Sequence, residues 1–96
     1  MKKEEIIDFL HAHKEEFATR FGVKKLALFG SYVRDEAKEE SDIDIVVEIE
    51  SHNSFRSFFG LKYHLESIFG KKVDLGIESN LKPVVKERIK DEMIYV

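Results

Sequence analysis

The chain has 96 residues, 43% of them hydrophobic, which is enough for one compact domain with its own core. It contains 19 acidic and 16 basic residues and no cysteine, which argues against a general nucleic-acid binder and excludes disulfides, thiolate nucleophiles and cysteine zinc sites. The charged start is unlike a signal peptide and no apolar run reaches membrane-spanning length, so we expect a soluble, cytoplasmic domain.

The first part of the chain predicts a helix, a strand and a short helix. Residues 3–21 carry apolar residues at helical spacing, and Gly22 is suited to end that helix. Residues 24–29 form a short apolar run that predicts a strand. Gly30 and Ser31 end this strand, and residues 32–38 are expected to form a short helix.

The next stretch, residues 42–50, alternates between apolar and acidic residues and therefore predicts a strand with one buried side. Its apolar face holds Ile43, Ile45, Val47 and Ile49. Because the buried face is aliphatic, we expect Asp42 and Asp44 on the opposite, open face, where a functional site would be accessible.

The remaining chain predicts a long helix, a third strand and a closing helix. Residues 55–69 follow helical spacing, with Ser54 as the expected N-cap and an apolar stripe of Phe55, Phe58, Leu61, Leu65, Ile68 and Phe69. Residues 71–78 alternate as a strand that puts Asp74 on the polar face and leaves space beside it at Gly76. Residues 80–96 are expected to be a helix with Pro83 in its first turn and a buried stripe of Leu81, Val84 or Val85, Ile89 and Met93.

This order of elements predicts a single domain over residues 1–96. Three strands with helices gathered on their apolar face make an α+β fold, an α/β two-layer arrangement with a three-stranded sheet. No internal repeat, linker or low-complexity segment interrupts the chain.

The polar face of the sheet has the residue types of a metal and phosphate site. Asp42 and Asp44 point the same way with Cα atoms roughly 6.5–7 Å apart, and a neighbouring strand about 4.8 Å away would bring Asp74 beside them. Carboxylates are ligands for Mg²⁺, either as one ion or as a two-ion site. Backbone N–H groups at the Gly30–Ser31 turn are suited to hold nucleotide phosphates, and Arg34 could add a charged contact.

Each of these signals has an ordinary explanation when taken alone. Solvent-facing aspartate pairs are common on strands, and a Gly-Ser turn after a strand is ordinary turn chemistry. Their joint occurrence on one sheet face favours a metal–phosphate site, with an in-line displacement at the α-phosphorus of a nucleotide that releases pyrophosphate.

Gly30-Ser31, ten further residues and then Asp42-Ile43-Asp44 together resemble the GS-x10-DxD signature of the polymerase-beta-type nucleotidyltransferase superfamily. The surrounding LFGSYVR and SDIDIVVE resemble its minimal, single-domain MNT branch. The resemblance implies a mixed sheet, Asp42, Asp44 and Asp74 as catalytic carboxylates and metal ligands, ATP as substrate with Mg²⁺, and Gly30 and Ser31 as the nucleotide-binding turn.

The same resemblance implies a partner. MNT proteins are commonly encoded with a HEPN-domain toxin, act as its antitoxin, and in some cases transfer AMP to a toxin tyrosine. Two other readings stay open: an antitoxin that works by occlusion through Phe55, Phe59 and Tyr63, and a regulatory subunit that binds ATP without turnover. Base preference, acceptor and oligomeric state, homo-oligomer included, are left open by the sequence.

Overall fold

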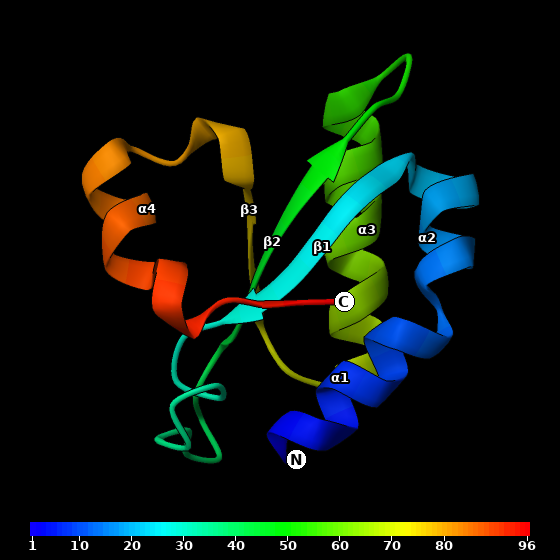
Figure 1. Ribbon diagram of the computed structural model, residues 1–96. Helices are drawn as coiled ribbons and strands as arrows, with labels where there is room; N and C mark the ends of the chain where they lie inside the picture. The colour runs from blue at the N-terminus through cyan, green and yellow to red at the C-terminus, as the bar shows by residue number, and fades with distance from the viewer.

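A four-stranded mixed sheet with strand order β3–β2–β1–β4 organises the computed structural model, which describes residues 1–96 (Figure 1). The strands are β1 (Val23–Phe29), β2 (Ile43–Ile49), β3 (Val73–Ile77) and β4 (Ile94–Tyr95). β1 pairs antiparallel with both β2 and β4, whereas β2 and β3 are parallel and are connected through α3. The predicted α+β fold is confirmed, but the predicted number of three strands is wrong.

Four α-helices surround this sheet. They are α1 (Lys3–Ala12), α2 (Lys14–Phe21), α3 (Ser54–Phe69) and α4 (Pro83–Ile89), with single 3-10 turns at Glu78–Asn80 and Lys90–Glu92. None of them is both long enough and apolar enough to cross a bilayer.

The predicted first helix is interrupted at His13. This residue ends α1 and precedes α2, with φ −107° and ψ 9°. Its backbone N–H and its Nδ1 both bond to the carbonyl oxygen of Phe9, at 3.1 and 2.9 Å, and its ring stacks on the Phe9 ring with centroids 4.1 Å apart. These contacts cap one helix and begin the next, while Gly22 ends α2 with a left-handed φ of 71°, as predicted.

The C-terminal segment differs most from its prediction. The expected helix 80–96 ends at Ile89, the only member of its predicted stripe that is buried. Beyond a 3-10 turn the chain turns extended, and Ile94 and Tyr95 pair with Leu28 and Ala27. β-Branched and aromatic residues suit a strand, and the open edge of β1 supplies the partner that a local pattern cannot reveal.

Helix α3 begins one residue earlier than predicted and buries a narrower stripe. Asn53, and not Ser54, is its N-cap, because the Asn53 side chain accepts a 3.0 Å hydrogen bond from the backbone N–H of Arg56. Of the predicted stripe, Phe55 is 75% exposed and Ile68 is 41% exposed. Phe55 lies in the first turn of the helix, where its ring contacts Phe59 but is not part of the core.

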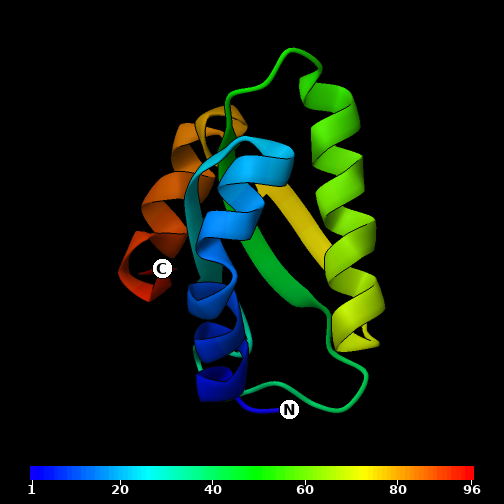
Figure 2. The same ribbon diagram turned by 90° about the vertical axis from the view of Figure 1, so that its right-hand side faces the viewer.

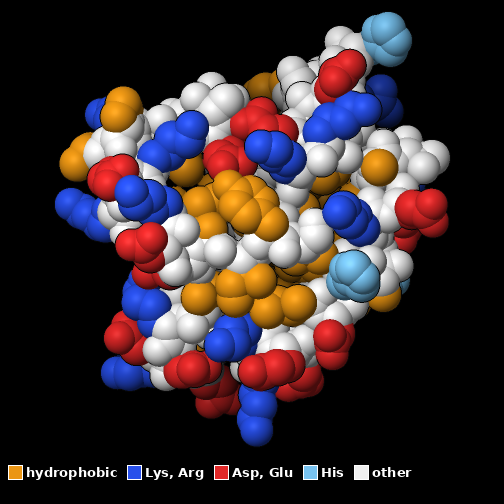
Figure 3. Space-filling model, viewed as in Figure 1, with side chains coloured by type: hydrophobic (Ala, Val, Ile, Leu, Met, Phe, Trp, Pro, Cys, Tyr) orange, Lys and Arg blue, Asp and Glu red, His pale blue; other side chains and the backbone are white.

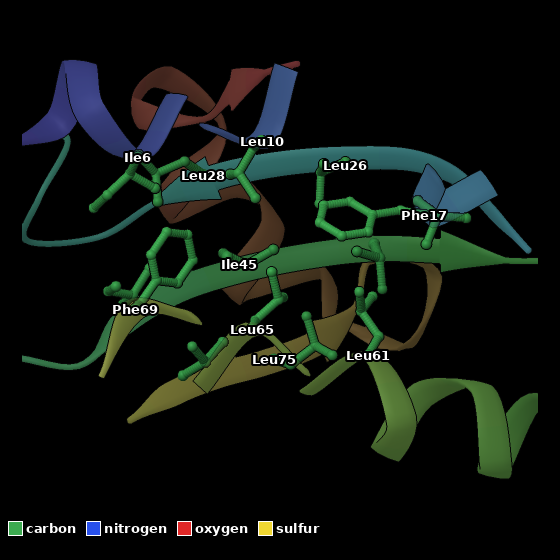
Figure 4. Packing of buried hydrophobic residues seen from close by; sticks show 14 of the residues in the cluster. Ile6, Leu10, Phe17, Leu26, Leu28, Ile45, Leu61, Leu65, Phe69 and Leu75 are labelled. Atoms are coloured by element: carbon green, nitrogen blue, oxygen red, sulfur yellow. The ribbon is translucent and has the colours of Figure 1, made fainter. Parts of the chain in front are cut away.

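The main core lies between the sheet and helices α1, α2 and α3. It is a cluster of 16 buried residues in which Ile6, Leu10 and Phe17 meet Leu26, Leu28, Ile45, Leu61 and Leu65 (Figure 4). Ile43, Ile45 and Val47 belong to it, so the predicted apolar face of β2 is confirmed. Burial of this much apolar surface is the main driving force for the fold.

On the other side of the sheet lie only α4 and the 3-10 turn Lys90–Glu92. Helices α1, α2 and α3 pack on one face of the sheet, as predicted, while the short helix α4 lies on the opposite side (Figure 2). Ala27, Val46 and Ile89 are buried but stand outside the main cluster. Hydrophobic side chains are gathered near the middle of this side, with charged side chains around them (Figure 3). Val46, which breaks the alternation of β2, is therefore an apolar residue of this outer face.

Candidate active site

The strand register brings two of the predicted carboxylates together. Asp44 of β2 lies directly opposite Asp74 of β3, and on its other side it lies opposite Phe29, the last residue of β1. Asp42 stands two residues before Asp44, just ahead of the strand. Asp42 and Asp74 are exposed and Asp44 is half-buried. Because residues opposite each other on adjacent strands share a face, Asp44 and Asp74 project from the outer face together.

Gly30 makes room for the Asp44 carboxylate. It has a left-handed φ of +84°, and a Cβ atom placed on it would lie 2.1 Å from Asp44 Oδ2. No side chain can occupy that position while the carboxylate stays in place. The glycine of the predicted motif is therefore required by the close approach of Asp44 as well as by the turn.

Burial and like charges act on Asp44. Burial, followed by the charges of Asp74 and Asp42, raises the pKa of Asp44 to about 6, while the Arg34 charge and a hydrogen bond from the Ser31 backbone N–H act in the opposite direction. This repulsion is what a bound cation would relieve. The residue is thus held in a partly desolvated, acidic environment.

The turn after β1 is not the start of a helix, contrary to prediction. Gly30 O accepts hydrogen bonds from the backbone N–H groups of Val33 and Arg34, at 3.1 and 3.2 Å. Ser31 O accepts one from Glu36 at 2.9 Å, and Asp35 has a positive φ of 59°, which stops any helix from continuing. The backbone N–H groups of Val33 to Glu36 are thus used within the turn, and the Ser31 N–H is directed to Asp44.

Arg34, the predicted phosphate contact, is held by two carboxylates. Its Nε donates to Glu36 Oε1 at 2.9 Å, and its Nη1 donates to both carboxylate oxygens of Glu92, at 3.0 and 3.1 Å. These acids raise the pKa of Arg34, Glu36 first and then Glu92. Sequence analysis missed Glu92. No local pattern marks it, since it reaches Arg34 only because the C-terminal segment returns across the sheet.

The donor set fits a hard cation. Oxygen ligands from carboxylates are those that Mg²⁺ prefers, often with only one or two of them from protein. No three His, Asp or Glu side chains of the chain enclose a common point, so the carboxylates are neighbours by register and charge and do not form a closed cage. An ion held here by Asp44 and its neighbours would complete its shell with water or phosphate oxygens.

Comparison with known proteins agrees with this arrangement. A family model described as a nucleotidyltransferase domain matches residues 10–96. The chain belongs to the nucleotidyltransferase family. A protein adenylyltransferase MntA of Thermococcus cleftensis is 46% identical over 93 residues, covering 97% of this chain and 94% of that protein.

Solved structures share the nucleotidyltransferase fold. A structure of a candidate minimal nucleotidyltransferase superposes with a TM-score of 0.80 at 32% identity, covering 98% of this chain and 95% of that one. A toxin–antitoxin structure with AMP-PNP has a TM-score of 0.69 at 21% identity, covering 88% of this chain and 69% of that one. The resemblance to the minimal branch is confirmed, and the chain is a nucleotidyltransferase.

Proposed function

We propose that this nucleotidyltransferase transfers AMP from ATP to a protein acceptor in a Mg²⁺-dependent reaction. The observation that carries the proposal is that Asp44 lies opposite Asp74 on the neighbouring strand. The Asp44 carboxylate also lies so close to Gly30 that no side chain fits at that position of the turn. A 46% identical relative bears the name protein adenylyltransferase, which supports a protein acceptor.

In this proposal Asp42, Asp44 and Asp74 hold the metal. Bound Mg²⁺ would neutralise the triphosphate and lower the pKa of the attacking hydroxyl. Asp74, exposed at the rim of the site, serves as a further ligand or as the base that accepts the hydroxyl proton. The new bond joins the acceptor oxygen to the α-phosphorus, and the bond to pyrophosphate breaks.

Two groups on the turn are suited to bind the phosphates. Ser31 carries a hydroxyl donor on the turn next to Asp44, and Arg34 carries its positive charge near the same carboxylate. Charge-assisted contacts of this kind orient the triphosphate for in-line displacement.

The acceptor we propose is a tyrosine of a HEPN-domain toxin encoded with this chain. The shared fold with solved toxin–antitoxin structures supports a partner of this class. The tyrosine hydroxyl would approach the exposed side of the site, where Asp42 and Asp74 are open to solvent.

Replacing Asp42 and Asp44 by asparagine tests the reaction. The co-purified native partner is incubated with ATP and Mg²⁺ and its intact mass is measured. The wild type is expected to add adenylyl groups, and the double variant to lose about a thousandfold or more in rate while still binding the partner. A wild type that leaves the partner mass unchanged would contradict the proposal.

One feature favours a second function, neutralisation by occlusion. Phe55, Phe59 and Tyr63 form an aromatic row on α3, with ring centroids 4.7 and 6.2 Å apart, and Phe55 and Tyr63 are 75% and 62% exposed. Exposed aromatic rows are typical of protein interfaces. Full protection from the toxin by the Asp42→Asn/Asp44→Asn variant would favour this function over catalysis.

A further inference from the structure

The guanidinium of Arg34 is held by hydrogen bonds from Nε and Nη1, and its Nη2 makes none. Arginine has five N–H donors in a rigid plane. Nε is bonded to Glu36 and Nη1 to Glu92, and no hydrogen bond of the structure involves Nη2. Arg34 is thus oriented by its two carboxylates and still has two donors for a third anion.

The two carboxylates differ in how firmly they are anchored. Glu36 is 65% exposed and lies on the same turn as Arg34, so it moves with that turn. Glu92 is only 21% exposed and comes from the 3-10 turn just before β4, whose strand pairing with β1 holds it in place. Its two bonds to Nη1 give Arg34 an attachment outside its own turn.

We propose that Glu92 is a positioning residue for nucleotidyl transfer, holding Arg34 so that its Nη2 edge can meet a phosphate of Mg²⁺-bound ATP. This role rests on the proposed phosphate contact of Arg34. A free arginine would lose rotamer entropy when it bound a phosphate, and a side chain already held in place loses less. Glu92 acts only through Arg34 and touches no substrate.

The test compares Glu92→Gln with Glu87→Gln. Glu87 lies close by in the chain and carries the same charge, but it pairs with Lys90 and not with Arg34. Dissociation constants for Mg²⁺–ATP are measured by calorimetry, KM and kcat by transfer to the native partner, and folding by Tm. Glu92→Gln is expected to weaken ATP binding and raise KM about three- to fivefold with kcat within about twofold, while Glu87→Gln stays at the wild-type values.

The decisive comparison uses Arg34→Gln as background. If Glu92 acts through Arg34, Glu92→Gln has no further effect on KM in this background. An equal effect in both backgrounds, or an unchanged KM in Glu92→Gln alone, overturns the positioning role.

The outcomes separate this inference from the proposed reaction. If the wild type transfers AMP and Glu92→Gln behaves like it, only the positioning role fails. The wild type could instead bind Mg²⁺–ATP without transferring AMP, while Glu92→Gln weakens ATP binding and Glu87→Gln does not. In that case the proposed reaction fails and the positioning role stands. A wild type that does not bind Mg²⁺–ATP overturns both.

Discussion

The two faces of the central sheet carry different side chains, although the same strands contribute residues to both. On one face, alternate residues of β1, β2 and β3 enter a 16-residue apolar cluster under α1, α2 and α3. On the other, β2 and β3 carry Asp44 and Asp74, and only a small apolar area with Val46 is buried. Because the two sets of side chains alternate along one backbone, stability and chemistry can be changed separately by choosing the face.

The largest effect on stability is expected from the core face. Leu65→Ala removes a fully buried side chain and should lower the free energy of unfolding by about 2–5 kcal/mol. Val46→Ala on the outer face should cost about 1–2 kcal/mol, since it deletes two methyl groups. Urea unfolding measures both. Transfer per folded molecule should survive Leu65→Ala, and its loss would show that the faces are not separable.

Alanine substitutions at Gly30 and Gly70 distinguish the effect of backbone strain from the effect of a clash with the Asp44 carboxylate. Gly30→Ala places a methyl group on the Asp44 carboxylate and should lower transfer about a hundredfold. Gly70→Ala is the matched control, because Gly70 also has a left-handed φ, of +65°, but an added Cβ would meet nothing within 4 Å. Both variants should lose about 1–2 kcal/mol of stability from backbone strain. Equal transfer rates for the two would refute the close approach of Gly30 to Asp44.

A smaller effect is expected from pH, and it belongs to the outer face. The folded pKa of Asp44, raised to about 6, lies above its unfolded value of about 4, so the folded state binds a proton first. Unfolding free energy of the metal-free protein should therefore rise as the pH falls from about 7.5 towards about 4.5. Urea unfolding in the presence of a metal chelator measures this pH dependence. The Asp44→Asn variant should lose the part of the pH dependence that comes from Asp44. A wild-type slope identical to that of the variant would contradict the raised pKa of Asp44.

The smallest effect on stability is expected at the exposed residue Phe55 in the first turn of α3. Phe55 is 75% exposed, so Phe55→Ser should change the free energy of unfolding by less than about 0.5 kcal/mol. Phe58→Ser, at a neighbouring residue that packs against the main core, should cost clearly more. Thermal unfolding of the two variants measures the difference. Similar losses would mean that Phe55 contributes to the core despite its exposure.

Sequence patterns predicted the features that depend on local alternation. The buried face of β2, the placement of Asp44 and Asp74 on the polar face and the C-terminal stop at Gly22 all follow from periods of two or from turn chemistry, whereas the direct pairing of the two aspartates comes from the strand register. β4 was missed because a two-residue strand is defined by the edge it joins. The segment after Gly30 does not form the predicted helix, because Asp35 adopts a positive φ that a helix cannot continue through.

The residues of the candidate site also divide into those that local sequence predicts and those that only the fold brings together. Asp42, Asp44, Gly30 and Ser31 lie within one short stretch and could be predicted together, and their roles in metal and phosphate binding stay predictions. Glu92 could not be predicted, because its contact with Arg34 spans 58 residues and depends on the return of the C-terminal segment.

The parallel pairing of β2 and β3 has a consequence for partly folded chains. Asp44 and Asp74 stand on either side of α3 in the sequence, so they become neighbours only when the whole β2–α3–β3 crossover has closed. A chain whose β3 has detached keeps Asp42 and Asp44 together but separates Asp74 from them, and the proposed site is then incomplete. Under the proposed function, nucleotidyl transfer would therefore require the complete β2–α3–β3 unit, and partly unfolded copies would be inactive.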